Sequence, residues 1–230
     1  METKQYTKQD KLIAMLHHNM AIFGGFMAVY AILNRCDFMG NAQTSNLIYL
    51  VLAILGTDFR AVLIRLVAVL IYMLGAICYV LVKNKTKLSV QYVGVLVDAV
   101  SVFLLALIPE EANPIVALYP IFFAMSFQWN AFPGSYGYVS STIFSTNNTR
   151  QVSLALGEYL CDHKKKHLHK AGFFLGSLAG FHIGVAAGYF ATKFFGLEGI
   201  WFDLIFLVPA AILIYCANAE EENGDLTVLS

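Results

Sequence analysis

The sequence predicts an all-α integral membrane protein with six full transmembrane helices, two short helices and a two-fold internal repeat. Three observations support this fold class. Hydrophobic residues make up 58% of the 230 residues and charged residues only 13%, whereas soluble domains contain roughly 45–50% apolar and about 25% charged residues. Apolar runs of about 20 residues, long enough to cross a bilayer, recur along the chain. Two polar runs interrupt them at corresponding places in the two halves.

The first half contains three predicted spans, at residues 12–33, 61–82 and 90–108. A polar run at residues 34–46 follows the first span. The next apolar segment, residues 47–56, is only about half as long as a span. This segment either crosses the membrane as an additional span or enters the membrane and returns to the same side.

The second half repeats this order. A Pro-Gly segment at residues 133–137 breaks the first of its apolar runs, and the second polar run follows at residues 140–150. Residues 152–160 are again too short to cross alone, and a basic loop occupies residues 161–170. The predicted spans of this half are residues 115–132, 171–195 and 200–216, and an acidic tail, residues 217–230, closes the chain.

The polar runs define the internal repeat. Thr44-Ser45-Asn46 lies in the first run, and Thr146-Asn147-Asn148 lies 102 residues later in the second. Repeat one covers about residues 12–108 and repeat two about residues 115–216. Residues 1–230 therefore form a single membrane domain without a separate soluble one.

The charge pattern favours an inverted repeat. Cytoplasmic loops collect Lys and Arg, and basic segments lie at residues 83–87 and 164–170. If both short segments cross, giving eight spans, these two loops lie on opposite sides. If both short segments are re-entrant, six spans remain, and both loops and both termini lie in the cytoplasm. An odd number of spans per repeat then forces the halves to be inverted.

The two polar runs are the predicted functional site. Thr, Ser and Asn are good helix N-caps, so the triplets would present free N–H groups and positive helix ends near the membrane midplane. Two such ends meeting from opposite faces would repel cations and admit a small neutral or anionic solute. The candidate binding or pore residues are Asn41, Thr44, Ser45, Asn46, Gln128, Asn130, Thr146, Asn147, Asn148, Arg150 and Asp98.

The alternative interpretation is that both runs are extramembrane loops whose triplets cap surface helices. Asp98 is a separate candidate, because a carboxylate in mid-span needs a partner or a water-filled cavity. His182 is ionisable as well, although a lone His is more often hydrogen-bonded to a neighbouring helix. Asp203 and Glu158 lie nearer to segment ends, where an interfacial position is expected.

Five glycines at four-residue spacing form a ladder suited to close helix packing. It either joins two helices of one chain or forms a subunit interface, which leaves a homo-oligomer open. These residues are Gly172, Gly176, Gly180, Gly184 and Gly188.

Other function classes have little support in the sequence. A formal net charge of zero gives no indication of a nucleic-acid partner. His163, His167 and His169 have a spacing that could hold a metal, but they stand among lysines in a solvated loop, so neither a metal site nor a cofactor is predicted. No Ser/His, HExxH or paired-carboxylate arrangement has a spacing usable for catalysis, and an enzyme is not expected.

The motifs resemble those of the YoaK family of bacterial membrane proteins. Gly24-Gly25-Phe26 with residues 30–46 is similar to its first signature, and residues 124–131 with Ser141, Thr142 and the second triplet are similar to its second. The resemblance covers about residues 15–216. Many members carry an acidic residue where Ala28 stands and Thr-Gly-Asn at both triplets. The resemblance implies a multi-pass protein of the bacterial inner membrane, in a family of unknown function whose members are often labelled small-molecule permeases.

The sequence therefore predicts a permease or channel that contacts membrane lipids and carries a small neutral or anionic solute between the two polar runs. The alternative, from another class, is a structural or regulatory membrane protein that binds a partner through the glycine ladder.

Overall fold

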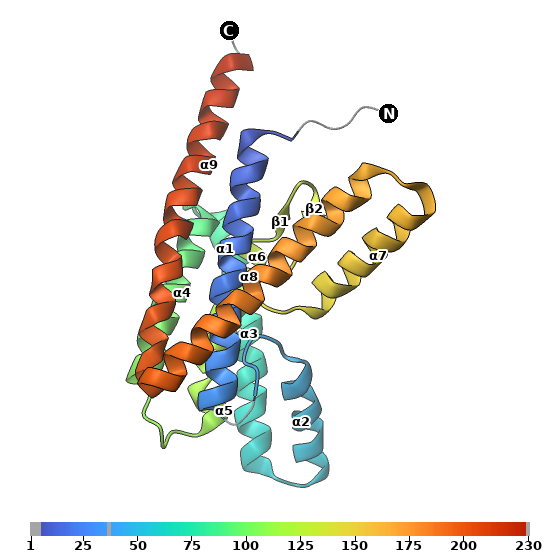
Figure 1. Cartoon of the computed structure of the whole chain (residues 1–230). Coiled ribbons are helices and arrows are strands. Elements are labelled where there is room, and N and C mark those ends of the chain that lie inside the picture. The colour runs from blue at the N-terminus through green and yellow to red at the C-terminus, as the bar shows by residue number, and fades with distance from the viewer. Residues whose placement is uncertain (1–5, 36–37, 229–230) are drawn as a thin grey trace.

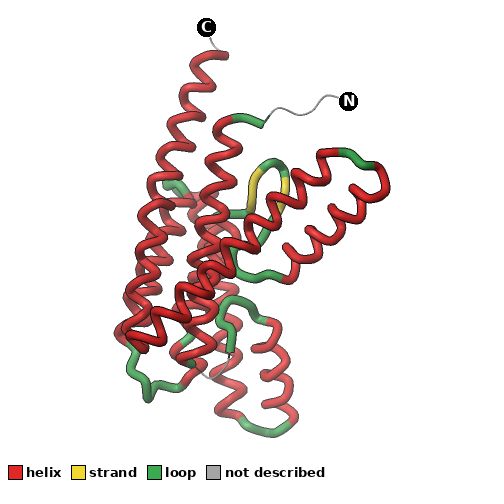
Figure 2. Tube along the Cα trace, in the orientation of Figure 1, coloured by secondary structure: helices red, strands yellow, loops and turns green. Residues whose placement is uncertain are grey.

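The computed structural model describes residues 6–35 and 38–228, and helices dominate it (Figure 1, Figure 2). The last two residues of the predicted acidic tail lie outside the described residues. The elements are α1 (Lys8–Asn34), α2 (Thr44–Leu55), α3 (Phe59–Lys85), α4 (Val90–Leu107), α5 (Pro114–Ala117), α6 (Tyr119–Ala131), β1 (Gly134–Ser135), β2 (Tyr138–Val139), α7 (Thr146–Asp162), α8 (Lys165–Phe195), the 3-10 helix η1 (Gly196–Phe206) and α9 (Leu207–Val228).

Side chains at the element ends explain several of these boundaries. Thr7 and Asp10 form a capping box that starts α1, and Asp58 caps α3 by accepting from Ala61 N. β1 and β2 pair antiparallel. Their tight turn includes Gly137 at φ +78°, a conformation that glycine adopts without steric cost.

Four helical stretches in the described part of the chain are long and apolar enough to cross a membrane. They are Lys8–Asn34, Phe59–Lys85, Val90–Leu107 and Lys165–Glu220, the last of which combines α8, η1 and most of α9. Large apolar side chains point outward from them, such as Leu63 on α3 (63% exposed) and Val208 on α9 (62% exposed). So much outward-facing apolar surface suits lipid contact, and by length and composition these helices are compatible with a membrane protein.

Two predicted spans differ from the observed helices. Residues 115–132 form the short helix α5 and the 13-residue helix α6, because Pro120 has no backbone N–H to continue the ladder. Residues 200–216 begin in η1 and continue into α9. A 3-10 run of 11 residues is unusually long, and such stretches often mark a hinge or a strained segment.

The helices pack in a crossed arrangement. α1 lies along α8, α3 lies along α6, and α4 contacts α6, η1 and α9. The short helices sit at the outside: α2 packs on α3 and α7 packs on α8, so that two hairpins project from the bundle (Figure 1). The buried core lies mainly between α1, α4, α6 and α9.

One end of the bundle gathers both terminal helices and the basic segments. Lys8 at the start of α1 pairs with Glu220 near the end of α9, and the His169 ring at the start of α8 stacks on Tyr6. The start of α4, which follows the basic turn at residues 83–87, lies at the same end, because Gly94 lies against Phe132, whose carbonyl contacts His17. The last turn of α1, the end of α4 and the start of α6 lie at the other end.

Candidate functional site

The polar runs and the long helices converge on the middle of α1. Gly24 and Gly25 make this possible, because each faces the backbone of another segment. A Cβ built on Gly24 would lie 2.2 Å from Thr142 O, and one built on Gly25 would lie 1.9 Å from Phe181 O. Only residues without a side chain allow this approach. The second polar run therefore contacts α1 directly.

The two polar runs also touch each other. Asn41 in the first run is fully buried, and its Nδ2 donates to Gly24 O at 2.7 Å and to Ile143 O in the second run at 3.0 Å. Gln128 on α6 donates from Nε2 to Met20 O at 3.1 Å and to Thr142 Oγ1 at 2.9 Å. The structure thus brings Asn41, Gln128 and the second run together around α1.

The last residue of each triplet is buried at the third position of its short helix. In α2, Asn46 Nδ2 donates to Gln43 Oε1 at 2.9 Å and to Arg65 O at 3.1 Å. In α7, Asn148 Nδ2 donates to Ser141 O at 2.7 Å, and its Oδ1 accepts from Ser140 Oγ at 3.0 Å. Both amides fix the loop that leads into their helix.

The triplets form the first helical turns and are not the N-caps. The N-cap positions are Gln43 for α2 and Ser145 for α7, and neither side chain makes a capping hydrogen bond. Each short helix therefore begins beside the centre of the bundle without a side-chain cap on its first turn. From there α2 and α7 run away in different directions (Figure 1).

The remaining candidate residues lie at the margin of this centre. Thr44, Thr146 and Arg150 are exposed, and Ser45, Asn130 and Asn147 are half-buried. Asn147 Oδ1 accepts from Arg150 at 3.4 Å, and Asn130 donates to Ser126 O in its own helix at 2.8 Å. The structure does not bring these side chains to the contact between the runs.

A pair of buried carboxyl groups lies on another side of α1. Asp98 on α4 and Asp203 on η1 are both 0% exposed, and they lie on two elements that pack together. No carboxyl oxygen of either residue has a hydrogen-bond partner within the described part of the chain. The sequence placed Asp203 nearer to a segment end, and it did not indicate that the side chain is fully buried inside the protein. The helical pattern could not reveal that these two elements pack together, because the two residues are 105 positions apart.

Arg35 is a further buried charged residue. Its side chain reaches the end of α4. NH2 donates to Ile108 O at 2.9 Å and NH1 donates to Pro109 O at 2.9 Å. The guanidinium satisfies carbonyls at a helix C-terminus, where a positive charge is favourable. Arg35 thus ties the end of α1 to the end of α4.

The glycine ladder lies against α1 over most of its length. A Cβ on Gly184 would lie 1.8 Å from Ile22 O, and one on Gly180 would lie 2.6 Å from His18 O. Gly176 and Gly188 face side chains of α1, whereas Gly172 has open space around it. Four of the five glycines therefore allow α8 to pack closely on α1 of the same chain.

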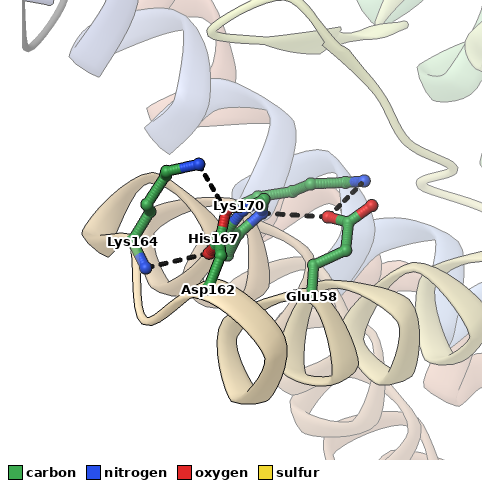
Figure 3. Close-up of polar contacts among 5 residues, drawn as sticks. All are labelled: Glu158, Asp162, Lys164, His167 and Lys170. Carbon is green, nitrogen blue, oxygen red and sulfur yellow. Dashed lines mark hydrogen bonds and ion pairs between the residues drawn. The ribbon is translucent and has the colours of Figure 1, made fainter. Parts of the chain in front are cut away.

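The histidine-rich loop between α7 and α8 forms an ion-pair cluster (Figure 3). His167 contacts Glu158 at 2.9 Å and Asp162 at 3.1 Å, and Lys164 pairs with Asp162 at 2.9 Å. The hydrogen bond from Lys164 holds the pKa of Asp162 well below its usual value. No group of three potential metal ligands occurs among the described residues. The cluster fastens the tip of the α7–α8 hairpin.

Together these features define a class of protein: a helical domain whose apolar helices are compatible with a membrane protein, and whose two polar runs meet beside α1 before two projecting hairpins. Residues 16–214 match the family described as "Protein of unknown function (DUF1275)". The chain belongs to this family. No curated protein matches the chain, and no solved structure matches it either.

Proposed function

We propose that this protein is a permease for a small neutral or anionic solute, built from two halves of opposite orientation in the bacterial inner membrane. The contact between the two polar runs at Asn41 and Ile143 carries the proposal. This contact joins the two segments that lead into α2 and α7, so the uncapped N-termini of both short helices lie beside the same polar contact. In transporters with inverted repeats, discontinuous helices of this kind form the substrate site near the midplane.

The packing supports two related halves. α1 opens repeat one and packs on α8 of repeat two, while α6 of repeat two packs on α3 of repeat one. The last helix of repeat one, α4, packs on the last helical stretch of repeat two, η1 with α9. Reciprocal contacts of this kind are what a two-fold axis generates. The basic segments and both terminal helices share one end, which is the cytoplasmic end by the distribution of Lys and Arg.

The charge of the centre sets the solute class. Helix N-termini carry partial positive charge and free N–H groups, which favour anions and polar neutral molecules. The buried amides at the contact are occupied by protein carbonyls. Solute access therefore requires the hairpins to move, as in a carrier that alternates between two open states.

The alternative function, partner binding through the glycine ladder, has less support. α1 occupies the face of Gly176, Gly180, Gly184 and Gly188. A partner helix would have to displace α1 from the core to use that face.

A flux assay tests the proposal. We expect purified protein in liposomes to raise the permeation of at least one of glycerol, urea, chloride and formate. The half-buried residues beside the helix starts are the ones a solute reaches, so Ser45→Trp and Asn147→Trp should lower that flux at least tenfold. Ile48→Trp and Leu154→Trp, on the exposed faces of the same helices, serve as matched controls. Permeation equal to that of empty liposomes, or flux unchanged in both loop variants, would refute the proposal.

A further inference from the structure

The carboxyl pair formed by Asp98 and Asp203 has no role in the solute site described above. The inward face of α4 is defined by Gly94, Asp98, Ser101, Val102 and Leu105, whose spacing follows one side of a helix. Asp98 and Ser101 are the polar members of this face. Ser101 Oγ is buried and, like both carboxyl groups, has no hydrogen-bond partner among the described residues. Three unpaired oxygen-bearing side chains thus lie on two elements that pack together.

The pair lies near the middle of the membrane domain. α1 has 27 residues and is about 40 Å long at 1.5 Å per residue. Asn19, near its midpoint, donates to Phe206 O at 2.8 Å, and Phe206 is the last residue of η1, three positions after Asp203. Gly94, one turn before Asp98, packs on Phe132, whose carbonyl contacts His17. Both carboxyl groups are therefore level with the middle of α1, far from either end.

Within the part of the chain that the structure describes, no Lys, Arg or His forms an ion pair with either carboxyl group. The titratable or charged side chains of the packed elements interact elsewhere. His17 contacts Phe132 O, Arg35 donates to a carbonyl at the end of α4, and Tyr119 donates to Ile64 O. The Tyr30 hydroxyl lies in the electrostatic field of Arg35. Cys216 on α9 is half-buried, while Glu198 at the start of η1 is exposed and accepts from Trp201. Two carboxylates close together in an apolar interior cannot both be ionised without a counter-charge.

We propose that Asp98 and Asp203 form a proton-binding site at the centre of the membrane domain, and that this site couples solute movement to proton movement. The coupling rests on the proposed function, whereas proton binding does not. Near neutral pH the pair holds at least one proton. When the halves separate and water enters, an Asp O–H bond breaks, the carboxylate keeps the electron pair, and water takes the proton. Ser101 is placed to donate a hydrogen bond to the carboxylate left behind.

A proton suits this site better than a metal cation. Ca²⁺ and Mg²⁺ take six or more oxygen ligands, and the three side chains here supply at most five oxygen atoms, two from each carboxylate and one from Ser101. A carboxylic acid needs only the proton itself. The 3-10 geometry of η1 places Asp203 on the kind of segment that often acts as a hinge, so a shift of η1 would change the environment of both carboxyl groups at once.

Infrared spectroscopy of the purified full chain in liposomes tests the proposal without any transport. We expect a protonated carboxylic acid band near neutral pH that titrates in two coupled steps. Asp98→Asn and Asp203→Asn should each reduce the titration to one step, and the double variant should abolish the band. Glu198→Gln, an exposed carboxyl of the same element, should leave the titration unchanged. If the double variant does not fold, the two single variants decide the outcome, and Asp98→Glu should shift the band without removing it.

Three results would overturn the proton site. The first is the absence of a protonated carboxyl band near neutral pH. The second is an unchanged titration in both single variants. The third is loss of the band when sodium is added at constant pH, which would indicate a cation site. A band that behaves as expected in a protein without solute flux would refute the proposed function and leave the proton site standing.

Discussion

Replacing Gly184 with alanine tests the crossing of α1 and α8, on which the position of every site residue depends. A Cβ there would lie 1.8 Å from Ile22 O, 2.7 Å from Ile22 C and 2.9 Å from Phe26 N. All three atoms belong to the backbone of α1, so no side-chain rotation relieves the overlap. An ordinary contact begins at 3.4 Å, and the helices would have to separate locally by about 1.6 Å, the difference between 3.4 and 1.8 Å.

The size of the effect follows from two opposing contributions. Overpacking a tight contact costs typically 1–3 kcal/mol, and a clash with backbone lies at the upper end, about 3 kcal/mol. Alanine stabilises the helix by about 0.8–1 kcal/mol relative to glycine, because its helix propensity is higher. We therefore expect Gly184→Ala to lower the free energy of unfolding by about 2 kcal/mol.

Gly172→Ala is the matched control, because Gly172 belongs to the same ladder and helix but has no neighbouring atom within 4 Å of its Cβ position. We expect it to be neutral or to stabilise by up to about 1 kcal/mol. Reversible unfolding in mixed detergent micelles, followed by circular dichroism, measures both variants. The reasoning fails if Gly184→Ala is as stable as the natural protein, or if Gly172→Ala loses as much stability.

Two further predictions concern polar groups. Gln128→Leu removes the donor to Met20 O and Thr142 Oγ1 and should lower the free energy of unfolding by about 1–3 kcal/mol. Asn130→Leu loses one hydrogen bond within its own helix, and in the same unfolding assay it should cost less than half as much. Equal losses would contradict the role of Gln128 in joining α6 to α1 and the second polar run. The lowered pKa of Asp162 means that its charge stabilises the folded protein above the ordinary carboxyl pKa of about 3.8, and that this contribution disappears as pH falls through the lower folded-state value. Asp162→Asn should therefore reduce the melting temperature near pH 7, and this difference should shrink steadily as pH falls below 3.8. A difference that stays constant as the pH falls through the acid range would show that the charge of Asp162 is not the cause.

The long helices could be predicted from hydrophobicity alone. Residues 12–33 and 61–82 lie inside α1 and α3, and residues 90–108 end one residue beyond α4, because a bilayer imposes both length and composition on a span. The triplets at Thr44 and Thr146 mark the first residues of α2 and α7, since short polar side chains favour helix starts. Their role inside the first turn, rather than as caps, depends on the loops that precede them.

The rest depends on contacts between distant parts of the chain. Nothing in the local pattern around Asp203 distinguishes a buried carboxyl from an interfacial one, and it is buried where η1 packs among α1, α4 and α8. Arg35 likewise finds its carbonyl partners more than 70 positions away. The break at Pro120 was visible in the sequence, yet the apolar run around it suggested an unbroken span. Periodicity describes one helix at a time and does not show which faces meet.

The orientation of the two halves is the central claim, and a topology measurement tests it most directly. In a variant without Cys36, Cys78, Cys161 and Cys216, single cysteines at Asn84 and Lys165 report on the two basic segments, and one at Glu111 reports on the opposite end. Intact cells are treated with a membrane-impermeant thiol reagent. Protection at Asn84 and Lys165 together with labelling at Glu111 is the result that six spans and an inverted repeat predict. Labelling at only one of the two basic segments would mean eight spans and a parallel repeat, and would contradict the proposed site.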